Sequence, residues 1–197
     1  MTFKAFFGAI ALAAVLAMTA TAKEGTPAGW IISGSHPMFY EMGVAPNGGQ
    51  NRGPAGYLKS WEPVSGFGTM MQQIAADDYL GKRVRFSAAM RTENVAGWSG
   101  VWMRTDTPER TGATFDNMQD RPVKGTTGWS RHAIVLDVPT TATNISFGVL
   151  VSGEGAAWLD DAKFEVVPNS IPTTAPKAEP HKRAPDNLDF SQPVAAR

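Results

Sequence analysis

Residues Lys82 to Thr92 read KRVRFSAAMRT, and this stretch decides the fold class. Four apolar side chains, from Val84 to Met90, alternate with mostly polar ones. A period of two is typical of a β-strand that has one buried and one solvated face. The stretch therefore predicts a strand on the wall of a two-layer β structure.

Similar alternation recurs on both sides of this strand, separated by short clusters of glycine, proline and other turn residues. A single helical turn is expected around residues 75–80. Short strands at such intervals predict an all-β chain, a two-sheet antiparallel β-sandwich of the jelly-roll type. The further strands that we predict are Met38–Val44, Ala55–Trp61, Phe67–Ala76, Ser99–Asp106, Ser130–Val138, Asn144–Ser152 and Trp158–Val167.

The two ends of the chain differ from this middle part in composition. Residues 1–22 combine Lys4, an apolar run and a small-residue A-x-A pattern, which indicates a secretory signal peptide. Residues 168–197 hold six of the fourteen prolines and no glycine, which indicates an extended Pro-rich tail. The sequence thus predicts a signal peptide over 1–22, a sandwich domain over 23–167 and a tail over 168–197.

Composition limits the partners and the compartment. The chain has no cysteine, and 18 basic residues balance 18 acidic ones. This balance argues against the strongly basic face that nucleic acid requires, so no nucleic-acid partner is expected. After signal cleavage no membrane insertion is expected either, because no later run is apolar enough. We expect a periplasmic or secreted protein.

Residues Trp98 to Trp129, WSGVWMRTDTPERTGATFDNMQDRPVKGTTGW, carry the most distinctive chemistry. If Val101 faces the core, then Trp102 faces outward, and an outward tryptophan suggests a platform for a ligand. Loops are expected around Trp98 and Trp129. Aromatic faces beside hydrogen-bonding groups suit a carbohydrate or a similar polar small molecule. The predicted ligand-binding residues are Trp98, Trp102, Arg104, Asp116, Asn117, Arg121 and Trp129.

Each of these residues also has a structural explanation that the sequence leaves open. Trp102 is a core residue if both faces of its strand are covered, and Trp129 caps the core if it packs inward. Asp116 and Arg121 are able to fix their own loop through a local ion pair. Tyr57, Lys59 and Trp61 share one face of another predicted strand and form a second candidate platform.

Cofactors and catalysis find little support in the sequence. Asp160 and Asp161 are candidate ligands for a structural calcium ion, and no other cofactor is expected. The three histidines lie far apart, and the sequence holds no nucleophile or metal motif. We therefore predict a protein that is not an enzyme. An interaction module of the cell envelope is the alternative, and an unrecognised hydrolase is the third hypothesis.

Four runs of the sequence, WSGVWMR, FDNMQDRPVKGTTGW, IVLDVPTTATNISFGVLVSGEG and WLDDAKFEVV, resemble a β-sandwich domain of some arabinose-type bacterial transcription regulators. That domain is similar to carbohydrate-binding modules and galactose-binding-like jelly rolls. The resemblance implies a galactose-binding-like sandwich. The expected signal peptide and the lack of room for a helix-turn-helix depart from the regulator pattern, so no role in transcription is implied.

The tail offers one more likeness, because residues 187–190 (NLDF) are similar to the opening strand of carbohydrate-binding jelly rolls. Such a strand either remains from a following domain or folds back to complete a sheet and protect its edge.

Overall fold

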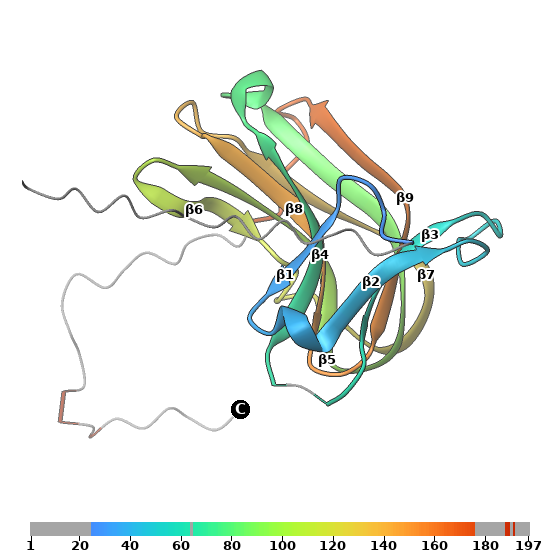
Figure 1. Ribbon diagram of the computed structural model, residues 1–197. Helices are drawn as coiled ribbons and strands as arrows, with labels where there is room; N and C mark the ends of the chain where they lie inside the picture. The colour runs from blue at the N-terminus through green and yellow to red at the C-terminus, as the bar shows by residue number, and fades with distance from the viewer. Residues whose placement is uncertain (1–24, 64, 176–187, 190, 192–197) are drawn as a thin grey trace, which may run out of the picture.

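A computed structural model describes residues 25–63, 65–175, 188–189 and 191. The described part of the chain is a two-sheet antiparallel β-sandwich, which confirms the predicted fold class (Figure 1). Its strands are β1 (Ile31–Gly34), β2 (Tyr40–Ala45), β3 (Ala55–Ser60), β4 (Phe67–Ala75), β5 (Arg83–Thr107), β6 (Arg110–Asp116), β7 (Val123–Asp137), β8 (Asn144–Ser152) and β9 (Ala156–Val167). Two 3-10 turns, η1 (Pro37–Phe39) and η2 (Asp77–Tyr79), complete it, and η2 lies where a helical turn was predicted.

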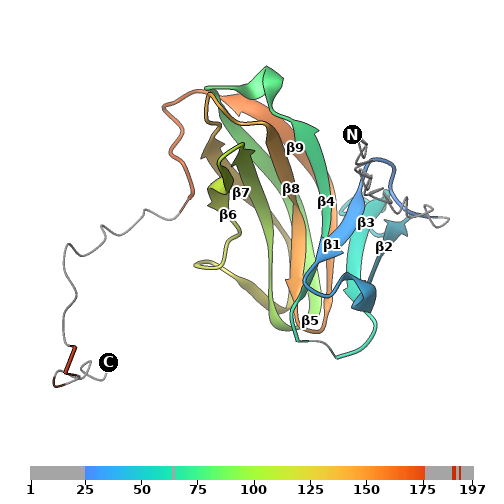
Figure 2. The same cartoon turned by 60° about the vertical axis from the view of Figure 1, so that its left-hand side comes forward.

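The two layers meet in the long strand β5. Its second half pairs with β8 and β6, and β8 pairs with β4, which pairs with β1. We call this layer, β1-β4-β8-β5-β6, the first sheet. The first half of β5 pairs with β7 and β9, and β3 and β2 follow beyond β9. This layer, β7-β5-β9-β3-β2, is the second sheet, and Figure 2 shows the two layers from the side.

Strand β5 bends at a place where the sequence predicted a loop between two separate strands. Lys82–Thr92 and Ser99–Asp106 were predicted as separate strands with Trp98 in a loop, yet all but Lys82 lie within β5. The bend lies near Asn94, which has a positive φ of 53°. The β8–β9 turn packs against it, since Ala96 N donates to Glu154 O at 2.9 Å and a side chain at Gly97 would collide with Ser152 O. The turn-like residues around Asn94 therefore form a bend at which β5 passes from one sheet to the other.

The core fills the space between the sheets. Val84, Phe86 and Met90 of the first stretch quoted above are fully buried, as the alternation predicted. Val101 and Met103 are also fully buried, which places Trp102 and Arg104 on the opposite, outer face of the first sheet. Phe147 of the first sheet packs against Phe86 of the second, and the centroids of the two rings lie 4.9 Å apart. This orientation of β5 positions the candidate site.

The start of the tail is part of the fold. Thr174 N donates to Val135 O at 2.9 Å, and Val135 N donates to the Thr174 hydroxyl at 2.9 Å, along the edge strand β7. Arg83 Nη1 donates to the carbonyl oxygens of Asn169 and Ile171 at 2.7 and 2.6 Å. Residues 169–174 therefore protect part of an edge.

The signal peptide predicted over residues 1–22 lies outside the described residues. Half of the strand predicted at 187–190 is described, and Leu188 and Asp189 form a turn there rather than a strand. Across the described ranges, no helix is long and apolar enough to cross a membrane.

Candidate functional site

A cleft of about 490 Å³ lies on the outer face of the first sheet. Strands β1, β4, β8 and β5 supply its floor, and β6 and the residue that follows it supply one wall. The lining residues are Ile31, Ser33, Gly34, Phe67, Thr69, Met71, Gln73, Trp98, Trp102, Arg104, Phe115, Asn117, Leu150 and Ser152. The cleft thus combines aromatic and aliphatic surface with amide, hydroxyl and guanidinium groups.

Strand register orders the floor into rows. Trp102 lies opposite Gly148, which lies opposite Met71, and this row forms the apolar centre. The next row holds Arg104 opposite Ser146, which lies opposite Gln73. Side chains two residues apart on a strand lie about 7 Å apart on one face. One end of the cleft is therefore polar, and Trp98 lies toward the other end.

Trp102 faces outward, as the alternation predicted, but it is only 7% exposed. Its ring packs against Met71, Leu150 and Trp98, and its indole Nε1 donates to the Thr69 hydroxyl at 2.7 Å. Thr69 in turn donates to Val149 O at 2.8 Å. Trp102 is thus a fixed part of the cleft floor, and the more accessible Trp98 beside it offers the better stacking surface.

Arg104 reaches into the polar end from β5. Its Nη2 donates to Asp106 Oδ2 at 2.9 Å, and its Nε lies 2.8 Å from Asp106 Oδ1. Gly112 N and Asn144 Nδ2 also donate to this carboxylate, at 2.8 and 2.9 Å. Burial acts to raise the pKa of Asp106, but the hydrogen bonds from Arg104, Gly112 and Asn144 outweigh burial and hold that pKa below its usual value.

Asp116, Asn117 and Arg121 form a local network at the end of β6. Asp116 is 1% exposed, and its carboxylate accepts from Met118 N at 2.9 Å and from Arg121 Nη2 at 2.6 Å. This is the ion pair that the sequence analysis left open as an alternative. Arg121 also contacts Asp120 at 2.7 Å. Asn117 lines the cleft, whereas the contacts of Asp116 and Arg121 fix the chain that carries Asn117.

Trp129 lies away from the cleft, on the second sheet and inside β7, so the loop predicted around it is wrong. The guanidinium of Arg91 lies 5.8 Å from its ring centroid and 3.6 Å from that of Trp158. Arg91 and Trp158 are register partners on β5 and β9. The seven predicted site residues therefore fall into three groups, and the cleft itself brings together Trp98, Trp102, Arg104 and Asn117.

The suggested second platform at Tyr57 and Trp61 is not one continuous surface. Tyr57 lies on β3 opposite Trp158, and its ring packs flat over Gly43, where a side chain would collide with it. Trp61 follows the end of β3 and is 69% exposed. Its indole Nε1 donates to Met38 O at 3.1 Å, so Trp61 and Met38 form a separate exposed patch.

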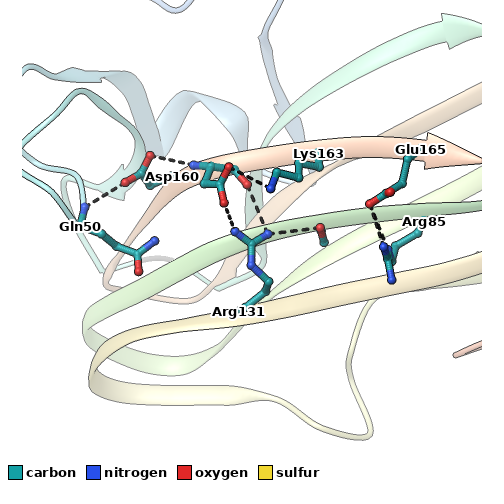
Figure 3. Close-up of polar contacts among 8 residues, drawn as sticks. Gln50, Arg85, Arg131, Asp160, Lys163 and Glu165 are labelled. Atoms are coloured by element: carbon teal, nitrogen blue, oxygen red, sulfur yellow. Dashed lines mark hydrogen bonds and ion pairs between the residues drawn. The ribbon is translucent and has the colours of Figure 1, made fainter.

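Asp160 and Asp161 already have partners within the fold, and Figure 3 shows those of Asp160. Asp160 accepts from Gln50 N at 2.9 Å and from Asp161 N at 2.7 Å. Asp161 contacts Arg131 and Lys163, and its positive φ of 47° marks a bulge in β9. Among the described residues, no group of three or more His, Cys, Asp or Glu side chains is placed to hold a metal ion. The contacts give both aspartates a structural role, and the calcium site stays a prediction.

Sequence reasoning missed several apolar residues of the cleft, above all Phe115, Phe67 and Ile31. All three are exposed, and Phe115 lies on β6 directly opposite Arg104. The sequence did contain a pattern that indicates Phe115. Phe115 and Asn117 are two residues apart, so on a strand they lie on the same face, and Asn117 was already a predicted site residue. Phe67 and Ile31 come from distant strands, so no local pattern connects them to Trp98.

Comparison with known proteins supports the resemblance that the sequence suggested. No model of a known protein family matches the chain. The uncharacterized HTH-type transcriptional regulator YbfP of Bacillus subtilis (strain 168) is 47% identical over 148 residues, which are 74% of this chain and 50% of the regulator. The chain therefore spans about half the length of the curated relative that it matches.

Solved structures with a similar fold include carbohydrate-binding modules. The Clostridium thermocellum xylanase 10B CBM22-1–GH10 structure, complexed with xylohexaose, has a TM-score of 0.57 and 14% identity, covering 74% of this chain and 27% of that one. The CBM22-1 xylan-binding domain of Paenibacillus barcinonensis Xyn10C has a TM-score of 0.52 and 15% identity, covering 73% and 89%. At such identities the likeness concerns the fold alone, and the chain shares the β-sandwich fold of these modules.

Proposed function

We propose that this chain binds a carbohydrate, or a similar polar small molecule, in the cleft of the first sheet and does not catalyse a reaction there. The observation that carries the proposal is the cleft itself, in which accessible aromatic rings lie beside amide, hydroxyl and guanidinium groups. Sugars present apolar C–H faces and hydroxyl edges, which match aromatic rings and amide or guanidinium groups respectively. The likeness to carbohydrate-binding modules supports this assignment at the level of the fold.

The aromatic groups of the cleft are suited to stacking on the sugar, and the polar groups are suited to hydrogen bonding with its hydroxyl groups. Trp98 and Phe115 are accessible and suit stacking, whereas Trp102 is buried in the cluster on which Trp98 packs. Asn117, Gln73 and Arg104 supply hydrogen-bond donors and acceptors. A shallow site of this kind is expected to bind with a dissociation constant of roughly 1 mM to 1 µM, or about −4 to −8 kcal/mol.

The lining also supports a role without catalysis. Hydrolysis of a glycosidic bond ordinarily needs two carboxylates that flank it. Of the described residues that line the cleft, none carries a carboxylate on its side chain. Asp106 and Asp116 lie nearby, but both are engaged by arginine and backbone amides.

The test is a titration of tryptophan fluorescence on residues 23–197 with a panel of soluble glycans. We expect a saturable change, and Trp98→Ala should weaken binding at least about tenfold, as expected for a central aromatic contact. Trp129→Ala is the matched control, because the structure places that ring on the other sheet. Loss of binding in Trp129→Ala with retention in Trp98→Ala would move the site to the second sheet and contradict the proposal.

We also propose that the protein is exported to the periplasm or the outside of the cell, on the strength of residues 1–22. Amino-terminal sequencing of the mature protein should then begin near Lys23. An amino terminus that retains the apolar run would argue against cleavage.

A second candidate function, docking to another envelope protein, is favoured by the exposed patch of Trp61 and Met38. Trp61→Ala should then remove the partner from a pull-down on envelope extract without changing glycan binding. Truncation after Ala175 would test the tail while sparing the contacts of Asn169, Ile171 and Thr174. Retention of every partner in both variants would sink this candidate.

A further inference from the structure

We infer that the cleft selects a sugar chain that carries a carboxylate, that is, a uronate, and that Arg104 is the residue that determines this specificity. The inference rests on the proposed function, since it names the class of carbohydrate that the same cleft takes. It is carried by the charges of the cleft and by the way in which Arg104 is held.

Arg104 is the one charged side chain among the described residues that line the cleft. A neutral sugar has no need of a guanidinium, because amides and hydroxyls satisfy its hydroxyl groups. A carboxylate gains much more from arginine, whose planar fork pairs with both of its oxygens. With no acidic side chain in the lining, the cleft itself does not repel an anion.

Asp106 orients the guanidinium and leaves one end of it available. The carboxylate lies along the Nε and Nη2 side of Arg104, at 2.8 and 2.9 Å. Nη1 makes no hydrogen bond within the described part of the chain, and the Arg104 side chain is 34% exposed. An arginine has five N–H donors, so it is able to pair with one carboxylate along its side and a second at its end.

The negative charge of Asp106 does not cancel this second interaction, because other groups share it. Gly112 N donates to Oδ1 and Asn144 Nδ2 donates to Oδ2, at 2.8 and 2.9 Å. The lowered pKa of Asp106 agrees with a carboxylate whose charge is satisfied in place. Asp106 therefore acts as a positioning residue for Arg104.

The neighbours of Arg104 place it where a sugar substituent would reach it. Phe115 lies opposite Arg104 on β6 and is 44% exposed, and Ser146 lies opposite it on β8. A pyranose ring that stacks on Phe115 would bring a carboxylate at its edge toward the Nη1 end. The apolar row of Trp102 and Met71 then accommodates the rest of the chain.

The experiment compares matched acidic and neutral glycans by isothermal titration calorimetry on residues 23–197. One pair is a xylo-oligosaccharide with a glucuronate branch and the same backbone without the branch. A second pair is an oligogalacturonate and its methyl ester, in which a methyl group removes the charge of each carboxyl. We expect at least one acidic member to bind roughly tenfold or more tightly than its neutral partner, as expected for charged hydrogen bonds. The ratio should shrink at 1 M salt.

Two variants of the arginine–aspartate pair test the mechanism. Arg104→Gln should bring the ratio of acidic to neutral affinity to about one. Asp106→Asn should lower the ratio, because an amide offers one acceptor oxygen instead of two and no longer holds Arg104 through both Nε and Nη2. Arg110→Gln is the matched control: Arg110 lies on the exposed end of the same hairpin, outside the cleft lining, and its loss changes the net charge equally. The ratio should stay unchanged in it.

The outcomes separate the two proposals. Binding of glycans with equal affinity for both members of each pair would overturn the uronate inference and leave the proposed function standing. A preference for acidic glycans that falls equally in Arg104→Gln and Arg110→Gln would also overturn it, since net charge would then explain the preference. Absence of binding by every probe would overturn both. If Arg104→Gln fails to fold, a ratio in Asp106→Asn equal to or above that of the wild type would by itself contradict the inference.

Discussion

The outer faces of the two sheets carry the same kinds of side chain in different arrangements. The first sheet has Trp98, Trp102 and Arg104, and the second has Trp129, Trp158 and Arg91. Each arginine also contacts an acid two residues further along β5: Arg104 pairs with Asp106, and Arg91 with Glu93 at 3.8 Å. In the first sheet the rings border a cleft, and in the second the guanidinium of Arg91 lies against them.

The acid that accompanies each arginine explains the difference. Asp106 is short and is held by Gly112 N and Asn144 Nδ2, and it binds Arg104 through Nε and Nη2. Glu93 is longer and exposed, and it leaves Arg91 within 3.6 Å of the Trp158 ring centroid. A tryptophan near an arginine therefore indicates a binding surface only where something else holds the arginine.

The largest expected effect concerns the floor of the cleft. Trp102→Ala should lower the free energy of unfolding by about 3–5 kcal/mol, because it removes a large buried ring and leaves the Thr69 hydroxyl without its indole donor. Denaturation in urea measures this loss, and Trp102→Phe should lose less. A loss below about 1 kcal/mol in Trp102→Ala would show that Trp102 is an exposed platform rather than a floor.

A smaller effect is expected on the second sheet, where Arg91→Ala should lower the free energy of unfolding by about 1 kcal/mol. The reason is the loss of its contacts with Trp129 and Trp158. Glu93→Gln is the control, and it should change stability by less than about 0.5 kcal/mol because its ion pair is exposed. If both variants lost the same free energy of unfolding, the contribution of Arg91 would come from its ion pair with Glu93. The contacts with tryptophan would then not distinguish the two faces.

The smallest effect is a dependence of stability on pH. It tests whether Arg121 lies close to His132 on β7 rather than in the cleft. Burial, and then the charge of Arg121, lower the pKa of His132 below its usual value of 6.5. The unfolded chain therefore takes up this proton first as the pH falls. Stability should thus be lost from about pH 6.5 downward through the folded pKa of His132.

Thermal unfolding between pH 7 and pH 5 measures this loss. His132→Gln should lose less stability than the wild type over that range, and Arg121→Gln should reduce the dependence in part. Identical pH profiles for the wild type and both variants would mean that Arg121 does not act on His132.

Local patterns predicted the strands more reliably than their ends. The alternation in Lys82–Thr92 and in Asn144–Ser152 placed the correct side chains in the core between the sheets. The solvated opposite face expected for Lys82–Thr92 was wrong in part, because Ser87 and Ala89 are buried there as well. The same reasoning missed β1, which is short, and β6, which has weak alternation. It also divided β5 at Asn94–Gly97, since turn-like residues form a bend there while pairing continues.

The candidate site was predictable only where one strand supplies it. Alternation along β5 correctly grouped Trp102 with Arg104 on the outer face. It gave no means to exclude Trp129, which is near Trp98 in the sequence but lies on the other sheet. Phe67 and Ile31 were missed because register between distant strands brings them to the cleft.

By itself, the sequence determined the all-β class and which side of each strong strand is apolar, because both follow from the period of two in the local pattern. Tertiary structure alone decided that β5 turns from one sheet to the other, and so separated Trp98 from Trp129. It also decided that Asp106 holds Arg104, whereas Arg91 lies against tryptophan. These outcomes depend on contacts between residues that are far apart in the chain, such as Asn144 with Asp106, and no local pattern records them.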